Sequence, residues 1–165
     1  MNISFVGLGK LGLPLACCLA EAGNNVLGVD KNEVVLDKLN NGKLPLFEPD
    51  LEELWKNANE NILGFTDSYE RAIKETDATI ILVNTQLGDD GYADDFVVSA
   101  LSDIALNLKK HNKDYHLIVL SSTILPGTIT SKLIPLVESL SGKLYGKDFG
   151  FSYVPDFVKL GSVIW

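Results

Sequence analysis

Residues 7–12 read Gly7-Leu8-Gly9-Lys10-Leu11-Gly12 and come directly after an apolar run at 3–6 that is typical of a β-strand. The GxGxxG spacing is weak evidence alone, but between a strand and the start of a helix it is typical of a dinucleotide-binding turn. Gly7 permits the tight turn, Gly9 lets the backbone approach a pyrophosphate, and Gly12 lets the helix pack against the strand. The helix N-terminus, at Lys10 and Leu11, supplies N–H donors to that pyrophosphate.

An acidic residue, Asp30, occupies the position at which a dinucleotide-binding fold binds the ribose. Asp30 follows a second predicted strand at 25–29, 18 residues after Gly12. Its carboxylate can accept hydrogen bonds from both hydroxyls of the adenosine ribose, and it would repel a 2′-phosphate. Because the only nearby cation is Lys31, we expect NAD rather than NADP, with Asp30 and Lys31 at the ribose. The alternative is a tight turn that binds no ligand.

The composition limits the possible partners. The chain has 165 residues, 46% hydrophobic and 22% charged, with a net charge of −8. Such a charge argues against a nucleic-acid partner, because duplex binding needs clustered Lys and Arg. Arg71 is the only arginine, so a phosphate site must use backbone N–H groups. The sequence shows neither a signal peptide nor an apolar run long enough to span a bilayer, and we expect a cytoplasmic protein without a membrane partner.

Apolar runs rich in β-branched residues alternate with helical patterns along the whole chain, which is typical of successive βα units. This predicts an α/β fold with a doubly wound, mostly parallel six-stranded sheet, the Rossmann fold. We find no linker and expect one domain over 1–165. The expected strands are 3–6, 25–29, 62–65, 79–83, 117–121 and 149–153. The expected helices are 11–22, 32–40, 51–59, 68–74, 96–111 and 128–141.

Three other features have less specific explanations. The stretch 84–95 is acidic, with Asp89, Asp90, Asp94 and Asp95; it is either a solvated loop or a loop at the ligand-binding edge of the sheet. Cys17 and Cys18 are adjacent in a predicted helix, where they are best explained as small core residues. His111 and His116 have no further ligands at metal-binding spacing, so we expect no metal.

Longer stretches resemble one family of Rossmann proteins. Residues 28–32 and 39–54 resemble the UDP-glucose/GDP-mannose dehydrogenase family, and the second stretch includes Leu44-Pro45-Leu46-Phe47-Glu48-Pro49-Asp50-Leu51. Residues 121–128 and 153–162 match as well, so the resemblance covers essentially the whole chain. It implies that an enzyme oxidises the C6 alcohol of a nucleotide sugar to a carboxylate in two NAD-dependent steps, through an aldehyde and a thioester on a catalytic Cys. Residues 156–162 resemble the UDP-glucose branch.

The resemblance also implies what this chain lacks. The catalytic Cys of the family lies in a second, sugar-binding domain, so neither Cys17 nor Cys18 is expected to be the nucleophile. We expect a fragment whose nucleotide-sugar substrate binds through the absent domain. The family is commonly dimeric, and we expect a homodimeric parent enzyme.

Individual roles follow from the resemblance position by position. Thr123 corresponds to a Thr that helps to hold the catalytic water near the nicotinamide, although it could simply be a polar residue before the next helix. Asp156 corresponds to a Glu thought to assist proton transfer, but here the side chain is one methylene shorter and Val154 replaces an Asn. Asp156 could therefore be an ordinary loop acid. The residues expected beside the cofactor at the ends of the fourth and fifth strands are Val83, Asn84, Thr85, Ser122 and Thr123.

Two other functions remain open. A β-hydroxyacid dehydrogenase of the 6-phosphogluconate type shares the opening architecture, although the run at 45–54 favours the nucleotide-sugar family. A regulatory module that binds a nucleotide without catalysis is the second alternative. It is suggested by the altered motif around Asp156 and by residues 84–86, where many relatives have Pro-Thr-Pro and this chain keeps only Thr85.

Overall fold

The computed structural model describes residues 1–88, 91–111, 113–158 and 161–164. Its main feature is a six-stranded sheet in the order β3-β2-β1-β4-β7-β8, in which every neighbouring pair is parallel. This confirms the doubly wound Rossmann fold, because the strand order reverses direction beside β1, between β1 and β4. The strands are β1 (Asn2–Val6), β2 (Asn25–Val29), β3 (Ile62–Thr66), β4 (Ala78–Ile81), β7 (His116–Leu120) and β8 (Phe149–Tyr153).

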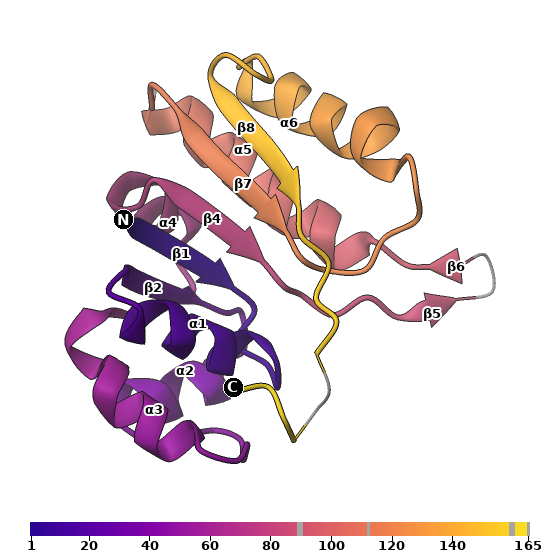
Figure 1. Ribbon diagram of the computed structural model, residues 1–165. Helices are drawn as coiled ribbons and strands as arrows, with labels where there is room; N and C mark the ends of the chain where they lie inside the picture. Colours follow the sequence, from indigo (N-terminus) through magenta and orange to yellow (C-terminus); the bar gives the residue numbers. More distant parts are fainter. Residues whose placement is uncertain (89–90, 112, 159–160, 165) are drawn as a thin grey trace.

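The helices form two groups, one on each face of the sheet (Figure 1). One group packs around Phe5 of β1, and the other packs around Val6, the next residue along the strand. Successive side chains of a strand point to opposite faces, so β1 contributes to both cores. The first group is α1 (Gly12–Glu21), α2 (Glu33–Asn40) and α3 (Leu51–Ala58), followed by the short turn η1 (Asn59–Asn61). The second is α4 (Tyr69–Glu75), α5 (Asp95–His111) and α6 (Ile134–Ser141).

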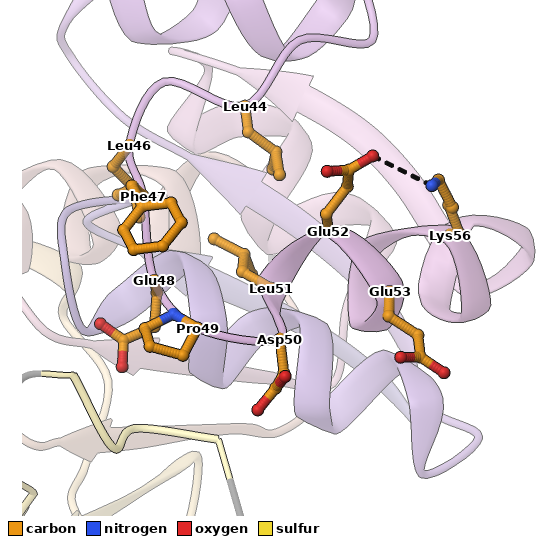
Figure 2. Close-up of a pocket in the computed structure, with 10 residues that line it drawn as sticks. All are labelled: Leu44, Leu46, Phe47, Glu48, Pro49, Asp50, Leu51, Glu52, Glu53 and Lys56. Atoms are coloured by element: carbon orange, nitrogen blue, oxygen red, sulfur yellow. Dashed lines mark hydrogen bonds and ion pairs between the residues drawn. The ribbon is translucent and has the colours of Figure 1, made fainter.

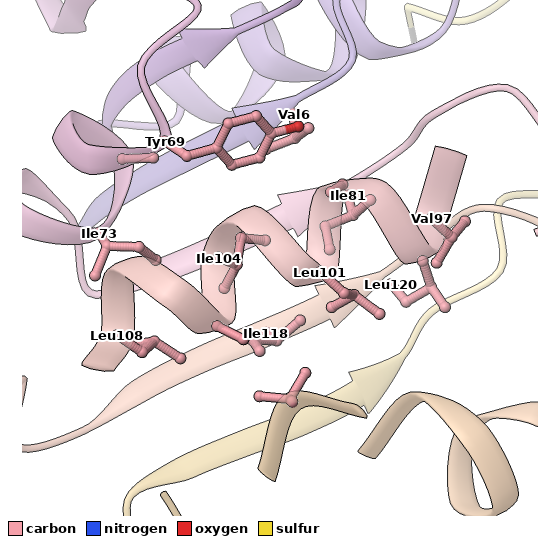
Figure 3. Close-up of a cluster of buried hydrophobic side chains, with 14 of the residues drawn as sticks. Val6, Tyr69, Ile73, Ile81, Val97, Leu101, Ile104, Leu108, Ile118 and Leu120 are labelled. Carbon is pink, nitrogen blue, oxygen red and sulfur yellow. The ribbon is translucent and has the colours of Figure 1, made fainter. Parts of the chain in front are cut away.

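Helix α5 is the centre of the second core. Leu101, Ile104 and Leu108 are fully buried on one side of it and pack with Ile118 and Leu120 of β7 (Figure 3). The spacing of three and four residues places these leucine and isoleucine side chains on one stripe of the helix. This packing fixes α5 against the sheet, with its N-terminus at the edge where the strands end.

Two predicted elements differ from the structure for identifiable reasons. The fourth strand ends at Ile81 rather than 83, because the Val83 N–H donates to the Ser122 hydroxyl, at 2.9 Å, instead of to a neighbouring strand. The last helix is interrupted: a wide π-type turn, η2 (Ile129–Leu133), precedes α6. Pro135 lacks an N–H and cannot close the regular bond to residue 131, which disfavours a regular helix through this turn.

The acidic stretch contains a hairpin that the sequence did not predict. Strands β5 (Leu87–Gly88) and β6 (Gly91–Tyr92) pair antiparallel and project from the edge at which the parallel strands end (Figure 1). Asp89, Asp90, Lys159 and Leu160 lie outside the described residues. Within the described part of the chain, no helix is long and apolar enough to cross a membrane.

Candidate cofactor site

The three glycines of the first turn have different surroundings. Gly7 has a φ of +97°, and a Cβ there would lie 2.2 Å from the Leu82 carbonyl oxygen. A Cβ on Gly12 would lie 1.8 Å from the Gly7 carbonyl oxygen. A Cβ on Gly9, in contrast, would meet no protein atom within 4 Å. Gly7 and Gly12 are therefore required by the packing of the turn itself, whereas Gly9 keeps open a space next to the backbone.

The Asp30 carboxylate is tied to that turn. One of its oxygens accepts the Leu8 N–H at 2.7 Å, and the other accepts the Asn32 N–H at 2.8 Å. Carboxylate oxygens that accept backbone N–H groups form strong, charge-assisted hydrogen bonds. Each oxygen still has acceptor capacity left, because a carboxylate offers about four lone-pair sites. The side chain can thus fix the turn and accept ribose hydroxyls at the same time.

A cavity of about 660 Å³ lies beside the turn, where β1, β2 and β4 end. Of the predicted site residues, it brings together Gly7, Gly9, Asp30, Lys31, Val83 and Asn84. Open α/β sheets bind ligands at this edge, where the strand order reverses, so the position is the one expected for a dinucleotide. The cavity is also lined by Val6, Asn32, Tyr69, Leu82, Gln86, Phe96 and Ser99, which the sequence did not identify.

Six of the residues predicted to bind the cofactor do not line this cavity. Ser122 lies behind it, where its hydroxyl accepts the Val83 N–H and donates to the Val83 carbonyl oxygen at 2.8 Å. It joins the end of β4 to the end of β7 and thereby fixes one wall of the cavity. The other five predicted residues outside the lining are Lys10, Leu11, Gly12, Thr85 and Thr123. Thr123 is exposed, just beyond the end of β7.

Lys31 lines the cavity, but its ammonium is paired with helix α5. Its Nζ lies 2.9 Å from an Asp103 carboxylate oxygen and 3.0 Å from the Ser99 hydroxyl. It also lies 5.5 Å from the centre of the Tyr69 ring, within the range of a cation–π contact. Burial, and then the charges of Asp103 and Asp30, raise the pKa of Tyr69, so its hydroxyl stays protonated. The Lys31 ammonium beside the cavity is thus paired within the protein itself.

Asp156 follows strand β8 and is half-buried. Burial raises the pKa of its carboxyl. Its buried Oδ2 has no hydrogen-bond partner among the residues that the structure describes. A carboxyl group with a raised pKa is protonated over a wider pH range than an ordinary Asp, which is the direction expected of a group that takes up and returns protons.

The two cysteines do not form a reactive site. Both belong to α1, and Cys17 is completely buried. Burial, with a smaller contribution from Cys18, raises the pKa of the Cys17 thiol to about 12. Burial, and then the charge of Glu21, raises the pKa of the Cys18 thiol. The thiolate is the nucleophilic form of cysteine, so these residues are unreactive at neutral pH.

Comparison with known proteins agrees with this geometry. Residues 1–165 match the family model described as "UDP-glucose/GDP-mannose dehydrogenase family, NAD binding domain". The chain belongs to this family. A GDP-mannose 6-dehydrogenase of Pseudomonas syringae pv. tomato is 40% identical over 99% of the chain, and a UDP-glucose 6-dehydrogenase of Haloferax volcanii is 34% identical over 99%. The chain spans 38% of the length of each relative.

A solved structure shows the same fold. The ternary complex of a GDP-mannose dehydrogenase from Pseudomonas aeruginosa superposes with a TM-score of 0.91 at 33% identity, over 98% of this chain and 37% of that one. The cofactor of this domain family is NAD, and the residues present here fit it. Gly9 leaves room beside the backbone for a pyrophosphate, and Asp30 presents a carboxylate to the same cavity.

Proposed function

We propose that this chain is the cofactor-binding part of a nucleotide-sugar 6-dehydrogenase, which oxidises the C6 alcohol of a nucleoside diphosphate hexose to the uronate in two NAD-dependent steps. The observation that carries the proposal is the match of residues 1–165 to the family together with a cavity that contains both Gly9 and Asp30. Bound NAD supplies the acceptor for a hydride. The relatives are more than twice as long, so we place the sugar-binding residues and the catalytic thiol outside this chain.

We assign the cofactor contacts by their place in the first turn and at the strand ends around the cavity, whether or not the residue itself lines the cavity. The turn and the first residues of α1 bind the pyrophosphate through backbone N–H groups, since a helix N-terminus favours anions. The end of β2 binds the adenosine ribose, and the ends of β4 and β7 lie toward the nicotinamide. The proposed residues are Gly7, Gly9, Lys10, Leu11 and Gly12 for the pyrophosphate, Asp30 and Lys31 for the ribose, and Val83, Asn84, Thr85, Ser122 and Thr123 for the remainder.

Two residues are proposed to act on the substrate side. The Thr123 hydroxyl can both donate and accept a hydrogen bond, as holding a water molecule requires, and it is exposed at the carboxyl edge of the sheet. The raised pKa of Asp156 suits it to take and return protons. Its shorter side chain leaves the carboxylate about 1.5 Å further back than a Glu, so its contribution depends on how the backbone places it.

The identity of the sugar nucleotide is the finer part of the proposal. Residues 156–162 resemble the UDP-glucose branch, whereas a GDP-mannose 6-dehydrogenase is the more similar of the two relatives described above. Both substrates are nucleoside diphosphate hexoses with a free C6 alcohol. We therefore propose this substrate class and treat UDP-glucose and GDP-mannose as the two substrates to be compared.

The deciding experiment is an assay of the protein at the full length that its gene encodes. We expect NADH formation, followed by absorbance, with one of the two sugar nucleotides, and about two NADH for each sugar oxidised. A protein that binds NAD but oxidises neither substrate would contradict the enzymatic proposal. That result would favour a non-catalytic nucleotide-binding module, the alternative suggested by Val154 and Asp156.

A further inference from the structure

A buried glutamate joins two distant parts of the chain. Glu48 lies in the segment before α3 and is 7% exposed. One of its carboxylate oxygens accepts the Gly161 N–H at 3.1 Å, and the other accepts the Val163 N–H at 3.0 Å. These partners follow Glu48 by 113 and 115 residues. Both oxygens are therefore used to hold the backbone that follows the last strand.

The side chains around this contact strengthen it. Val163 is 6% exposed, and Ile164 packs against the core that α1, α2 and α3 share with the sheet. In Figure 2 the Glu48 carboxylate points away from Glu52 and Glu53, which lie on the other side of the segment. The cavity of about 700 Å³ drawn there is lined by Leu44, Phe47 and neighbouring residues of this one segment. We assign it no ligand, because the buried carboxylate that lines it is already paired.

Gly161 and Val163 follow β8 in the chain, but their contact with Glu48 lies on the other side of the sheet from β8 (Figure 1). The chain leaves β8 at one edge of the sheet and reaches the neighbourhood of α1 across the ends of the strands (Figure 1). At its start, the Val154 N–H donates to the Leu120 carbonyl oxygen at 2.9 Å. At its end, residues 161–164 are held by Glu48 and by packing. Asp156 lies between these two attachments.

The chemistry makes the attachment sensitive to one side chain. A buried carboxylate needs hydrogen-bond donors to compensate for lost hydration, and here both come from the backbone. An amide at the same position would turn one acceptor into a donor directed at an N–H group. One of the two hydrogen bonds to the backbone would then be lost, although the side chain would keep its volume.

We infer that Glu48 is a positioning residue, which holds the segment containing Asp156 across the carboxyl edge of the sheet. The inference rests on the proposed role of Asp156 in the dehydrogenase. The inference adds a residue to the proposed machinery that does not line the cofactor cavity. Glu48 precedes α3, far from Asp156 in the sequence. Without this attachment, residues 161–164 would keep the packing of Val163 and Ile164 but lose both hydrogen bonds to the Glu48 carboxylate.

The test compares Glu48→Gln with Glu53→Gln in the protein at the full length that its gene encodes. Glu53 is an exposed carboxylate in the neighbouring helix α3, so its substitution removes the same charge without touching the contact. For Glu48→Gln we expect amide hydrogen exchange at Gly161 and Val163 to accelerate about tenfold or more. We also expect the pKa of Asp156, followed by carboxyl NMR, to fall toward the ordinary Asp value as the segment loosens. Glu53→Gln should change neither quantity.

Two results would overturn the inference. Unchanged exchange at Gly161 and Val163 would show that Glu48 does not hold the segment. Faster exchange with an unchanged Asp156 titration would show that Glu48 holds the segment without positioning Asp156. Neither measurement requires turnover, so the inference can fail while the proposed dehydrogenase activity is observed, and the reverse also holds.

A second variant covers the case in which Glu48→Gln does not fold. Gly161 has a φ of +83°, and a Cβ there meets no protein atom within 4 Å. Gly161→Ala therefore strains the backbone without a clash and loosens the same contact from the donor side. The same faster exchange at Val163 and the same change at Asp156 are expected, and their absence would contradict the inference.

Discussion

Gly9 and Gly12 belong to one turn but should respond differently to the same substitution. An alanine at Gly12 would place its Cβ 1.8 Å from a backbone oxygen, so the turn must shift. We expect Gly12→Ala to lower the free energy of unfolding by about 2–4 kcal/mol. An alanine at Gly9 meets no protein atom within 4 Å, and the stability should stay within about 1 kcal/mol. Its methyl group would nevertheless occupy the space proposed for the pyrophosphate.

Measuring NAD affinity separates the proposed role of Gly9 in binding from the role of Gly12 in packing. Gly9→Ala should weaken NAD binding about tenfold or more, which corresponds to about 1.4 kcal/mol. Calorimetric titration gives the affinity and denaturant unfolding gives the stability, so each variant acts as a control for the other. If Gly9→Ala bound NAD as tightly as the unchanged chain, the pyrophosphate would not approach the backbone at Gly9.

At the scale of elements, the predictions that succeeded depend on local patterns. The strands and most helices follow from apolar periodicity, and the strand after residue 24 matches the structure as 25–29. The prediction for β4 ended two residues too late because a side chain distant in sequence, Ser122, bonds to the backbone groups of Val83. Such a contact leaves no local signal.

The candidate site likewise contains residues that local sequence patterns predict and residues that only the fold brings together. Gly7, Gly9 and Asp30 were identified because their spacing along the chain follows from the chemistry of the ligand. Tyr69 and Phe96 line the same cavity, but in sequence they are ordinary residues at the starts of two helices. Only the packing of α4 and α5 against the sheet brings them to this cavity. The attachment of residues 161–164 to Glu48 could not be predicted for the same reason.

A buried polar network links three strands and should make stability depend on pH. His116 of β7 is fully buried, and its Nε2 lies 2.8 Å from the Thr79 hydroxyl of β4, which in turn lies 2.7 Å from the Ser4 hydroxyl of β1. Burial, with a further contribution from Lys113, lowers the pKa of His116 to about 4, against 6.5 for an ordinary histidine. The folded chain therefore keeps this imidazole neutral.

The sign of the effect follows from proton binding. Between pH 6.5 and about 4 the unfolded chain protonates His116 and the folded chain does not, so stability falls as the pH is lowered through this window. The loss from this one group approaches about 3 kcal/mol. His116→Gln keeps a hydrogen-bonding side chain but does not titrate. Denaturant unfolding at several pH values should show a smaller acid loss for this variant, and an equal loss would contradict the assignment.

At the scale of the whole molecule, the cofactor cavity joins the two halves of the sheet. Gly9 and Asp30 come from the βα units before β3, whereas Val83 follows the end of β4 and Phe96 lies at the start of α5. A ligand that contacts both halves binds the folded chain only, and it stabilises that state by mass action. Thermal unfolding therefore reports binding even where this chain has no turnover of its own.

We expect NAD to stabilise the chain more than NADP. At about 100 times its dissociation constant NAD should contribute about 2.7 kcal/mol, equivalent to about 5–10 °C in Tm for a domain of this size. NADP at the same concentration should give a smaller shift, because its 2′-phosphate meets the Asp30 carboxylate while Lys31 is paired with Asp103. Asp30→Ala should reduce the NAD shift and bring the two shifts together. Equal shifts in the unchanged chain would show that Asp30 does not select the cofactor.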